Sequence, residues 1–97
     1  MPVGRDDRRE ARRVAVTAAV GEKHAEAALD ILELGELAWH DCFDEASPPD
    51  DIIDDIFVCA EGDLSRFARA TRLAITDWRD LQLWAARVRV QRGHAGV

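Results

Sequence analysis

The stretch that decides the fold is HAEAALDILELGELAWHDCF, residues 24–43. When its residues are placed at intervals of about 100° around a helix axis, the acidic side chains fall on one stripe. Apolar side chains fill the remaining arc of roughly 200°, about twice the width that a helix with one buried face needs. We therefore expect a long helix over residues 24–43 that packs against two neighbours, one of them from a second copy of the chain.

A short helix is expected next, over residues 51–60. It follows a turn at Ser47, Pro48 and Pro49, because proline disfavours the helical conformation of the residue before it. Its expected buried face consists of Ile52, Ile53, Ile56, Phe57 and Ala60. Its expected exposed face consists of Asp51, Asp54, Asp55 and Val58. This pattern predicts a helix that packs across its longer neighbours.

A second long helix is expected over residues 64–88, with Asp63 as its N-cap. Its expected core face consists of Leu64, Phe67, Thr71, Ala74, Trp78, Leu81 and Ala85. In one continuous helix, Leu73 and Trp84 fall on the charged face. Either these two residues form a contact surface for a partner, or the helix bends near Asp77.

The sequence thus predicts an all-α antiparallel bundle. Its two long helices are crossed by the short helix, and a symmetric homodimer completes the core. Before the bundle, Ala and Val supply most of the apolar residues and Gly21 interrupts the helical pattern. The chain is therefore expected to divide into a basic arm that is partly helical or frayed, the bundle domain and a flexible tail, residues 1–23, 24–88 and 89–97.

Charge is divided sharply along the chain. Residues 24–63 carry thirteen carboxylates and no Lys or Arg. The preceding segment has six basic and four acidic residues, and the following one has seven basic and two acidic residues. The acidic middle is therefore expected to lie against its own flanks, with Arg66, Arg69 and Arg72 as candidates, or against a positive partner. A sequence pI of about 4.9 argues against a nucleic-acid partner.

The composition also indicates a location. No apolar run is long enough for a membrane span, and the Arg-rich N-terminus does not resemble a secretory signal. We therefore expect a cytoplasmic protein in which Cys42 and Cys59 are buried, unpaired thiols. His40 is expected at the surface, since neighbouring helical residues diverge by about 100° and cannot form a catalytic triad.

Two pairs of acidic residues are candidates for chemistry: Glu33 with Glu36, and Asp51 with Asp54. Residues three apart share a helix face, and two such pairs on packed helices can bind Mg²⁺ through oxygen atoms. The pattern is similar to the all-α nucleotide pyrophosphohydrolases of the MazG type, which bind their metal through Glu-x-x-Glu and Glu-x-x-Asp motifs on neighbouring helices. The resemblance implies metal-binding roles for these four residues and Mg²⁺-dependent hydrolysis of a nucleotide.

Glu36 also has a structural interpretation. It lies at the margin of the apolar arc, where a carboxylate must find a partner or change its pKa. His40 or the arginines between Arg66 and Arg72 are the partners that the sequence suggests.

The interpretation we favour is a non-enzymatic protein-interaction or regulatory module without a cofactor. Its acidic surface, or the patch formed by Leu73 and Trp84, would bind another protein. The Mg²⁺-dependent pyrophosphohydrolase is the alternative. A third interpretation is an acidic mimic of nucleic acid that occupies a basic partner.

Overall fold

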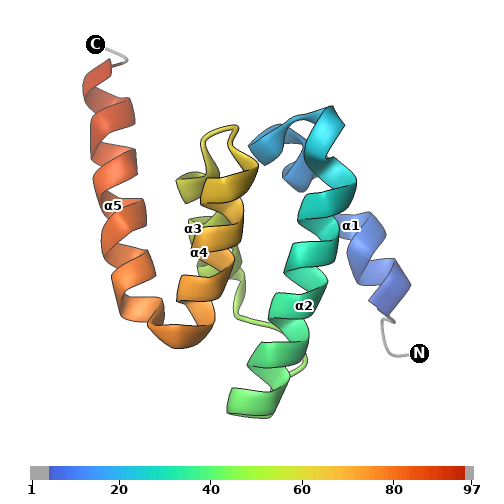
Figure 1. Ribbon diagram of the computed structural model, residues 1–97. Helices are drawn as coiled ribbons and strands as arrows, with labels where there is room; N and C mark the ends of the chain where they lie inside the picture. The colour runs from blue at the N-terminus through green and yellow to red at the C-terminus, as the bar shows by residue number, and fades with distance from the viewer. Residues whose placement is uncertain (1–4, 96–97) are drawn as a thin grey trace.

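The computed structural model describes residues 5–95, and within that range the chain is helical with no strand, which confirms the all-α class. This range forms five α-helices and one short 3₁₀ helix (Figure 1), whereas the bundle was expected to contain three helices. Their bounds are α1 Arg5–Val20, η1 Glu22–His24, α2 Ala25–Phe43, α3 Asp50–Ala60, α4 Leu64–Thr76 and α5 Trp78–Ala95. The first four residues of the expected arm and the last two of the expected tail lie outside the described range.

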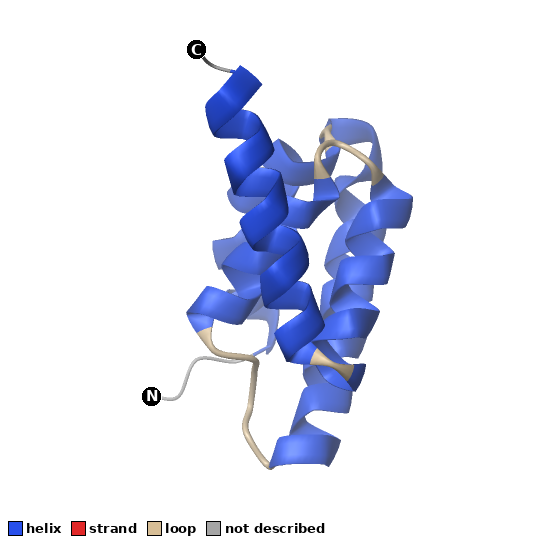
Figure 2. Cartoon of the chain, turned by 90° about the vertical axis from the view of Figure 1, so that its left-hand side faces the viewer, coloured by secondary structure: helices blue, strands red, loops and turns tan. Residues whose placement is uncertain are grey.

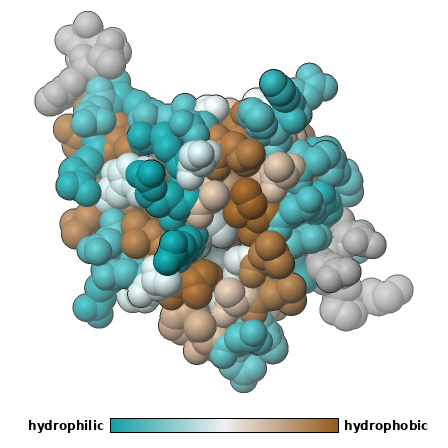
Figure 3. All heavy atoms as spheres, viewed as in Figure 1, coloured by the Kyte–Doolittle hydropathy of each residue, from teal (hydrophilic) through white to brown (hydrophobic). Residues whose placement is uncertain are grey.

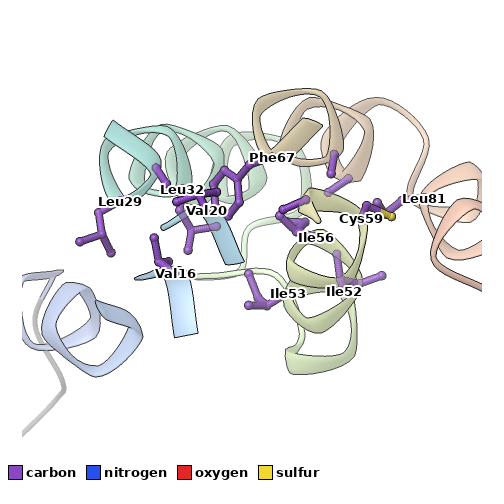
Figure 4. Close-up of a cluster of buried hydrophobic side chains, with 14 of the residues drawn as sticks. Val16, Val20, Leu29, Leu32, Ile52, Ile53, Ile56, Cys59, Phe67 and Leu81 are labelled. Carbon is purple, nitrogen blue, oxygen red and sulfur yellow. The ribbon is translucent and has the colours of Figure 1, made fainter. Parts of the chain in front are cut away.

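The N-terminal arm is not frayed over its described part. From Arg5 to Val20 it is the continuous helix α1, which packs on α2 and adds Val16 and Val20 to the core. Small apolar residues suffice there because α2 supplies the bulky Leu29 and Leu32 to the same cluster (Figure 4). The core of the bundle therefore includes α1, and does not begin at residue 24 as expected.

Helices α2 and α3 match the expected segments closely. Helix α2 ends where Asp44 adopts a left-handed conformation and its N–H donates to the His40 carbonyl at 2.8 Å. Its last turns extend beyond the rest of the bundle in two perpendicular views (Figures 1 and 2). Cys42 in that extension is exposed, which contradicts its expected burial, whereas Cys59 of α3 is buried as expected.

The expected helix 64–88 is two helices. The backbone leaves the helical conformation at Asp77, and α5 turns back along α3 and α4 (Figure 1). The side chain of Asp77 stabilises the new start by accepting a hydrogen bond from the Asp80 N–H at 3.3 Å. Helix α5 then continues to Ala95, so the expected flexible tail is helical over its described part.

Helices α2 and α4 run in the same direction in Figure 1, because α3 returns the chain between them. The two helices pack tightly at Gly35, where a Cβ atom would lie 2.6 Å from Cγ2 of the buried Thr71. Phe67 is the largest fully buried side chain of the described core, and it stacks on Phe57 with ring centroids 6.1 Å apart. Among the described helices, none combines the length and the apolar character that a membrane span requires.

Candidate functional site

Helix α1 neutralises the acidic residues in the first part of α2. Arg9 forms ion pairs with Glu26 at 2.8 Å, Asp30 at 2.9 Å and Glu33 at 3.3 Å. Arg13 also pairs with Glu26, and its hydrogen bond is the main reason that the pKa of Glu26 is lowered. Helix α1 is therefore the basic flank that neutralises the first part of the acidic segment.

Glu36 is the most buried member of this network. Its carboxylate accepts a hydrogen bond from Nε of Arg8 at 3.0 Å and from Nη1 of Arg12 at 2.7 Å. Arg12 also donates to Oγ of Ser47, so one guanidinium links α1, α2 and the loop before α3. The prediction that Glu36 needs a partner is confirmed, but the partners come from α1 and not from His40 or α4.

The four acids of the metal-binding alternative do not converge. Glu33 and Glu36 face the arginines of α1, while Asp51 and Asp54 are exposed on α3. In the described part of the chain, no three His, Cys, Asp or Glu side chains are grouped so that they could hold a metal ion. The structure therefore gives the MazG-like alternative no metal-binding geometry.

Arginines of α4 and α5 hold the C-terminal half of α3. Arg66 donates to the Cys59 carbonyl at 2.9 Å, and Arg89 pairs with Asp55 at 2.8 Å. Asp55 is buried, so its expected place on the exposed face of α3 is wrong. Arg69 and Arg72, the other expected partners of the acidic segment, have exposed side chains.

One group of carboxylates is left over from this neutralisation. It spans the end of α2, the following loop and the start of α3, and all of its members are exposed: Asp41, Asp44, Glu45, Asp50, Asp51 and Asp54. We call this group the acidic end. None of the six forms an ion pair with a Lys or Arg among the residues whose side chains the structure describes, 7–93. The exposed His40 lies beside two of them, with its ring nitrogens 3.9 Å from Asp41 and Asp44.

The bend at Asp77 changes the environment of the predicted interaction residues. Leu73 and Trp84 are half-buried, pack against the core and line one shallow groove between α4 and α5. The guanidinium of Arg66 lies 5.3 Å from the centre of the Trp84 ring. Trp78, expected in the core, is only half-buried. Trp78 and Trp84 are therefore buried to a more similar degree than a continuous helix would predict.

A second surface feature, which the sequence did not identify as a groove, separates α2 from α4. Its floor contains the small residues Gly35, Ala38 and Ala68, and its volume is about 330 Å³. Leu34 stands at its edge with 67% of its surface exposed. Figure 3 shows hydrophobic residues gathered along the middle of this face, with hydrophilic residues to either side. The broad apolar arc of α2 was the signal for this surface.

The geometry therefore offers an unneutralised acidic end and an apolar groove, both of which suit binding of another chain. Comparison of the chain with known protein families, with curated proteins and with solved structures found no significant match.

Proposed function

We propose that this protein is a non-enzymatic interaction module whose acidic end binds a basic segment of a partner protein. The observation that carries the proposal is the uneven neutralisation of the acidic segment. Arginines of α1 pair with the acids from Glu26 to Glu36, whereas the six carboxylates of the acidic end keep their charge exposed. Such a concentration of one sign attracts and orients a partner of the opposite sign.

The chemistry of the acidic end determines the class of partner. Nucleic acid and anionic membranes would be repelled by six exposed carboxylates. A peptide segment rich in Arg or Lys is the complementary surface. Because the carboxylates are exposed, binding depends on ionic strength, with a screening length of about 10 Å at about 0.1 M salt.

The proposal is tested with fluorescein-labelled hexaarginine amide and fluorescence anisotropy. The wild-type chain is expected to bind saturably at about 50 mM NaCl and much more weakly at about 300 mM NaCl. A triple variant of the acidic end, Asp41→Asn/Asp44→Asn/Glu45→Gln, removes three charges and should lose about tenfold or more in affinity. Such a loss of affinity would assign the binding of the peptide to the acidic end.

The matched control removes the same number of exposed charges elsewhere, as Asp7→Asn/Glu22→Gln/Asp80→Asn. It should retain most of the affinity. Equal losses in the two triple variants would mean that only net charge matters, and an absence of saturable binding to the wild type would contradict the proposal directly.

The same module is proposed to be a symmetric homodimer through the groove between α2 and α4. The exposed Leu34 and the floor of small residues are complementary, so a two-fold axis would place each Leu34 in the groove of the other copy. Light scattering at micromolar concentration should report about twice the 10.8 kDa mass of the chain.

The control for dimerisation uses two exposed apolar residues. Leu34→Glu should give a monomer, because it places a charge in the buried interface. Val14→Glu on α1, where Val14 is 81% exposed, should leave the dimer intact. A monomeric wild type, or a Leu34→Glu variant that remains dimeric, would rule out this interface.

A further inference from the structure

An aromatic pocket of about 330 Å³ opens at the acidic end. Trp39 and Phe43 from the end of α2 and Trp78 from the start of α5 supply its rings, and Glu45 and Asp51 supply two carboxylates. These residues come from three separate stretches of sequence. The bend at Asp77 is what brings Trp78 to the end of α2.

The aromatic rings line the pocket, and part of their surface is exposed. Trp39 and Phe43 are in contact, with ring centroids 4.2 Å apart and planes inclined by 39°. Trp39 is 95% buried, since only 5% of its surface is exposed, whereas Phe43 is 41% exposed. A ligand can therefore reach an aromatic surface whose inner part is already fixed by packing.

This combination of groups suits a guanidinium ion. The face of an aromatic ring attracts a cation through its quadrupole, and a planar guanidinium also stacks on the ring. Trp78 already interacts in this way with the protein's own Arg79, whose guanidinium carbon lies 5.3 Å from the ring centre. A guanidinium also forms directed hydrogen bonds with carboxylates, which Glu45 and Asp51 offer.

Trp39, one of the residues that line the pocket, carries one further polar group. The indole N–H of Trp39 is buried and has no acceptor in the described part of the chain. Buried donors are rarely left without a partner. The described chain therefore leaves one polar group of a pocket residue unsatisfied.

We propose that this pocket receives the side chain of one arginine from the basic partner segment. The inference rests on the proposed function and makes it more specific: the carboxylates of the acidic end attract the segment, and the aromatic pocket selects arginine over lysine. The selection follows because a lysine ammonium is compact, strongly hydrated and unable to stack.

The test uses a Trp84→Phe background, in which Trp39 and Trp78 are the remaining tryptophans and both line the pocket. Hexaarginine amide should change their fluorescence saturably. Hexalysine amide should bind about fivefold more weakly at equal ionic strength. Phe43→Ala should weaken hexaarginine by about fivefold and remove most of the preference for arginine.

Two carboxylate variants provide the matched comparison. Asp51→Asn changes a charge inside the pocket and should weaken hexaarginine several-fold. Asp54→Asn, one turn further along α3, removes a charge from the acidic end but not from the pocket, and should weaken the binding less than Asp51→Asn does. Because Asp51, Asp54 and Phe43 are all exposed, circular dichroism should show the same helical content in each variant.

The possible outcomes separate the inference from the proposed function. If Asp51→Asn and Asp54→Asn weaken saturable binding equally and Phe43→Ala leaves it unchanged, the pocket does not receive the arginine. The acidic end then remains the docking surface. Equal affinity for hexaarginine and hexalysine also contradicts the proposal that the pocket selects arginine. An absence of any saturable binding contradicts both.

Discussion

Glu36 joins α1 to α2 through two arginines. Only 9% of its side chain is exposed, and it accepts hydrogen bonds from both Arg8 and Arg12. Replacing it with Gln leaves two guanidinium groups without their shared negative partner. We expect Glu36→Gln to lower the free energy of unfolding by about 1–3 kcal/mol, as measured by urea denaturation.

Asp30 provides the control for this substitution. It also pairs with an arginine of α1, but 68% of its side chain is exposed. Asp30→Asn should therefore change the free energy of unfolding by less than about 1 kcal/mol. Equal and small effects of the two variants would show that the ion pairs of Glu36 do not stabilise the fold.

The two cysteines should differ strongly in reactivity. Cys42 is exposed near the end of α2, whereas Cys59 is fully buried. Burial, together with the nearby Asp55, raises the pKa of Cys59 to about 11, so this thiol remains protonated at neutral pH. A disulfide reagent should modify one thiol per folded chain and the second only after unfolding. Cys42→Ser should abolish the fast reaction, and two equally fast reactions would contradict the burial of Cys59.

At the scale of elements, the contact between α2 and α4 depends on the absence of a side chain at position 35. A Cβ atom there would lie 2.6 Å from Cγ2 of Thr71, which is itself buried. Overpacking costs about 1–3 kcal/mol, while replacing a helical Gly with Ala gains about 1 kcal/mol. We expect Gly35→Ala to lower the free energy of unfolding by about 1 kcal/mol in thermal or urea denaturation.

Thr71→Ser tests the cause of that loss. It removes Cγ2 but keeps the hydroxyl that donates to the Phe67 carbonyl. In the double variant Gly35→Ala/Thr71→Ser the loss should be smaller than the sum of the single losses. Strict additivity would mean that the two residues do not compete for the same space.

The bend between α4 and α5 leads to a prediction for two tryptophans. Trp78 and Trp84 are both half-buried, both pack against the core and both lie beneath a guanidinium at 5.3 Å. Trp78→Ala and Trp84→Ala should therefore cost similar amounts, about 1–3 kcal/mol each, in urea denaturation. A large cost for Trp78→Ala alone would contradict the similar environments of the two rings.

The sequence predicted the elements whose signals are local. The apolar arc of α2 and the prolines before α3 set the bounds of these two helices. The bend at Asp77 was one of two alternatives, because Leu73 and Trp84 signalled it but no Gly or Pro accompanies it, and packing of α5 on α3 and α4 stabilises it. The partners of Glu36 could not be predicted, because they depend on the docking of α1, whose Ala and Val residues give a weak amphipathic pattern.

At the scale of the whole molecule, charges at the two ends of α2 have opposite consequences. Near its start, Glu26 lies among arginines of α1, and its attraction to them holds the helices together. Toward its end, the six carboxylates of the acidic end repel one another. The repulsion lowers stability, but it preserves the negative surface that the proposed function requires.

The ion pairs between α1 and the start of α2 predict how the stability of the fold responds to acid. Hydrogen bonds from Arg13 lower the pKa of both Glu10 and Glu26 in the folded state. Their stabilising contribution is therefore complete above the pKa of the unfolded chain, near about 4.3, and is lost as pH falls through the lower folded value. In an Arg9→Gln/Arg13→Gln variant this contribution of Glu10 and Glu26 is absent, so its melting temperature should fall less between about pH 6 and about pH 3 than that of the wild type. The control Arg69→Gln/Arg72→Gln removes the same charge from α4 and should follow the wild type. Parallel behaviour of both variants and the wild type would show that the α1 network does not determine acid stability.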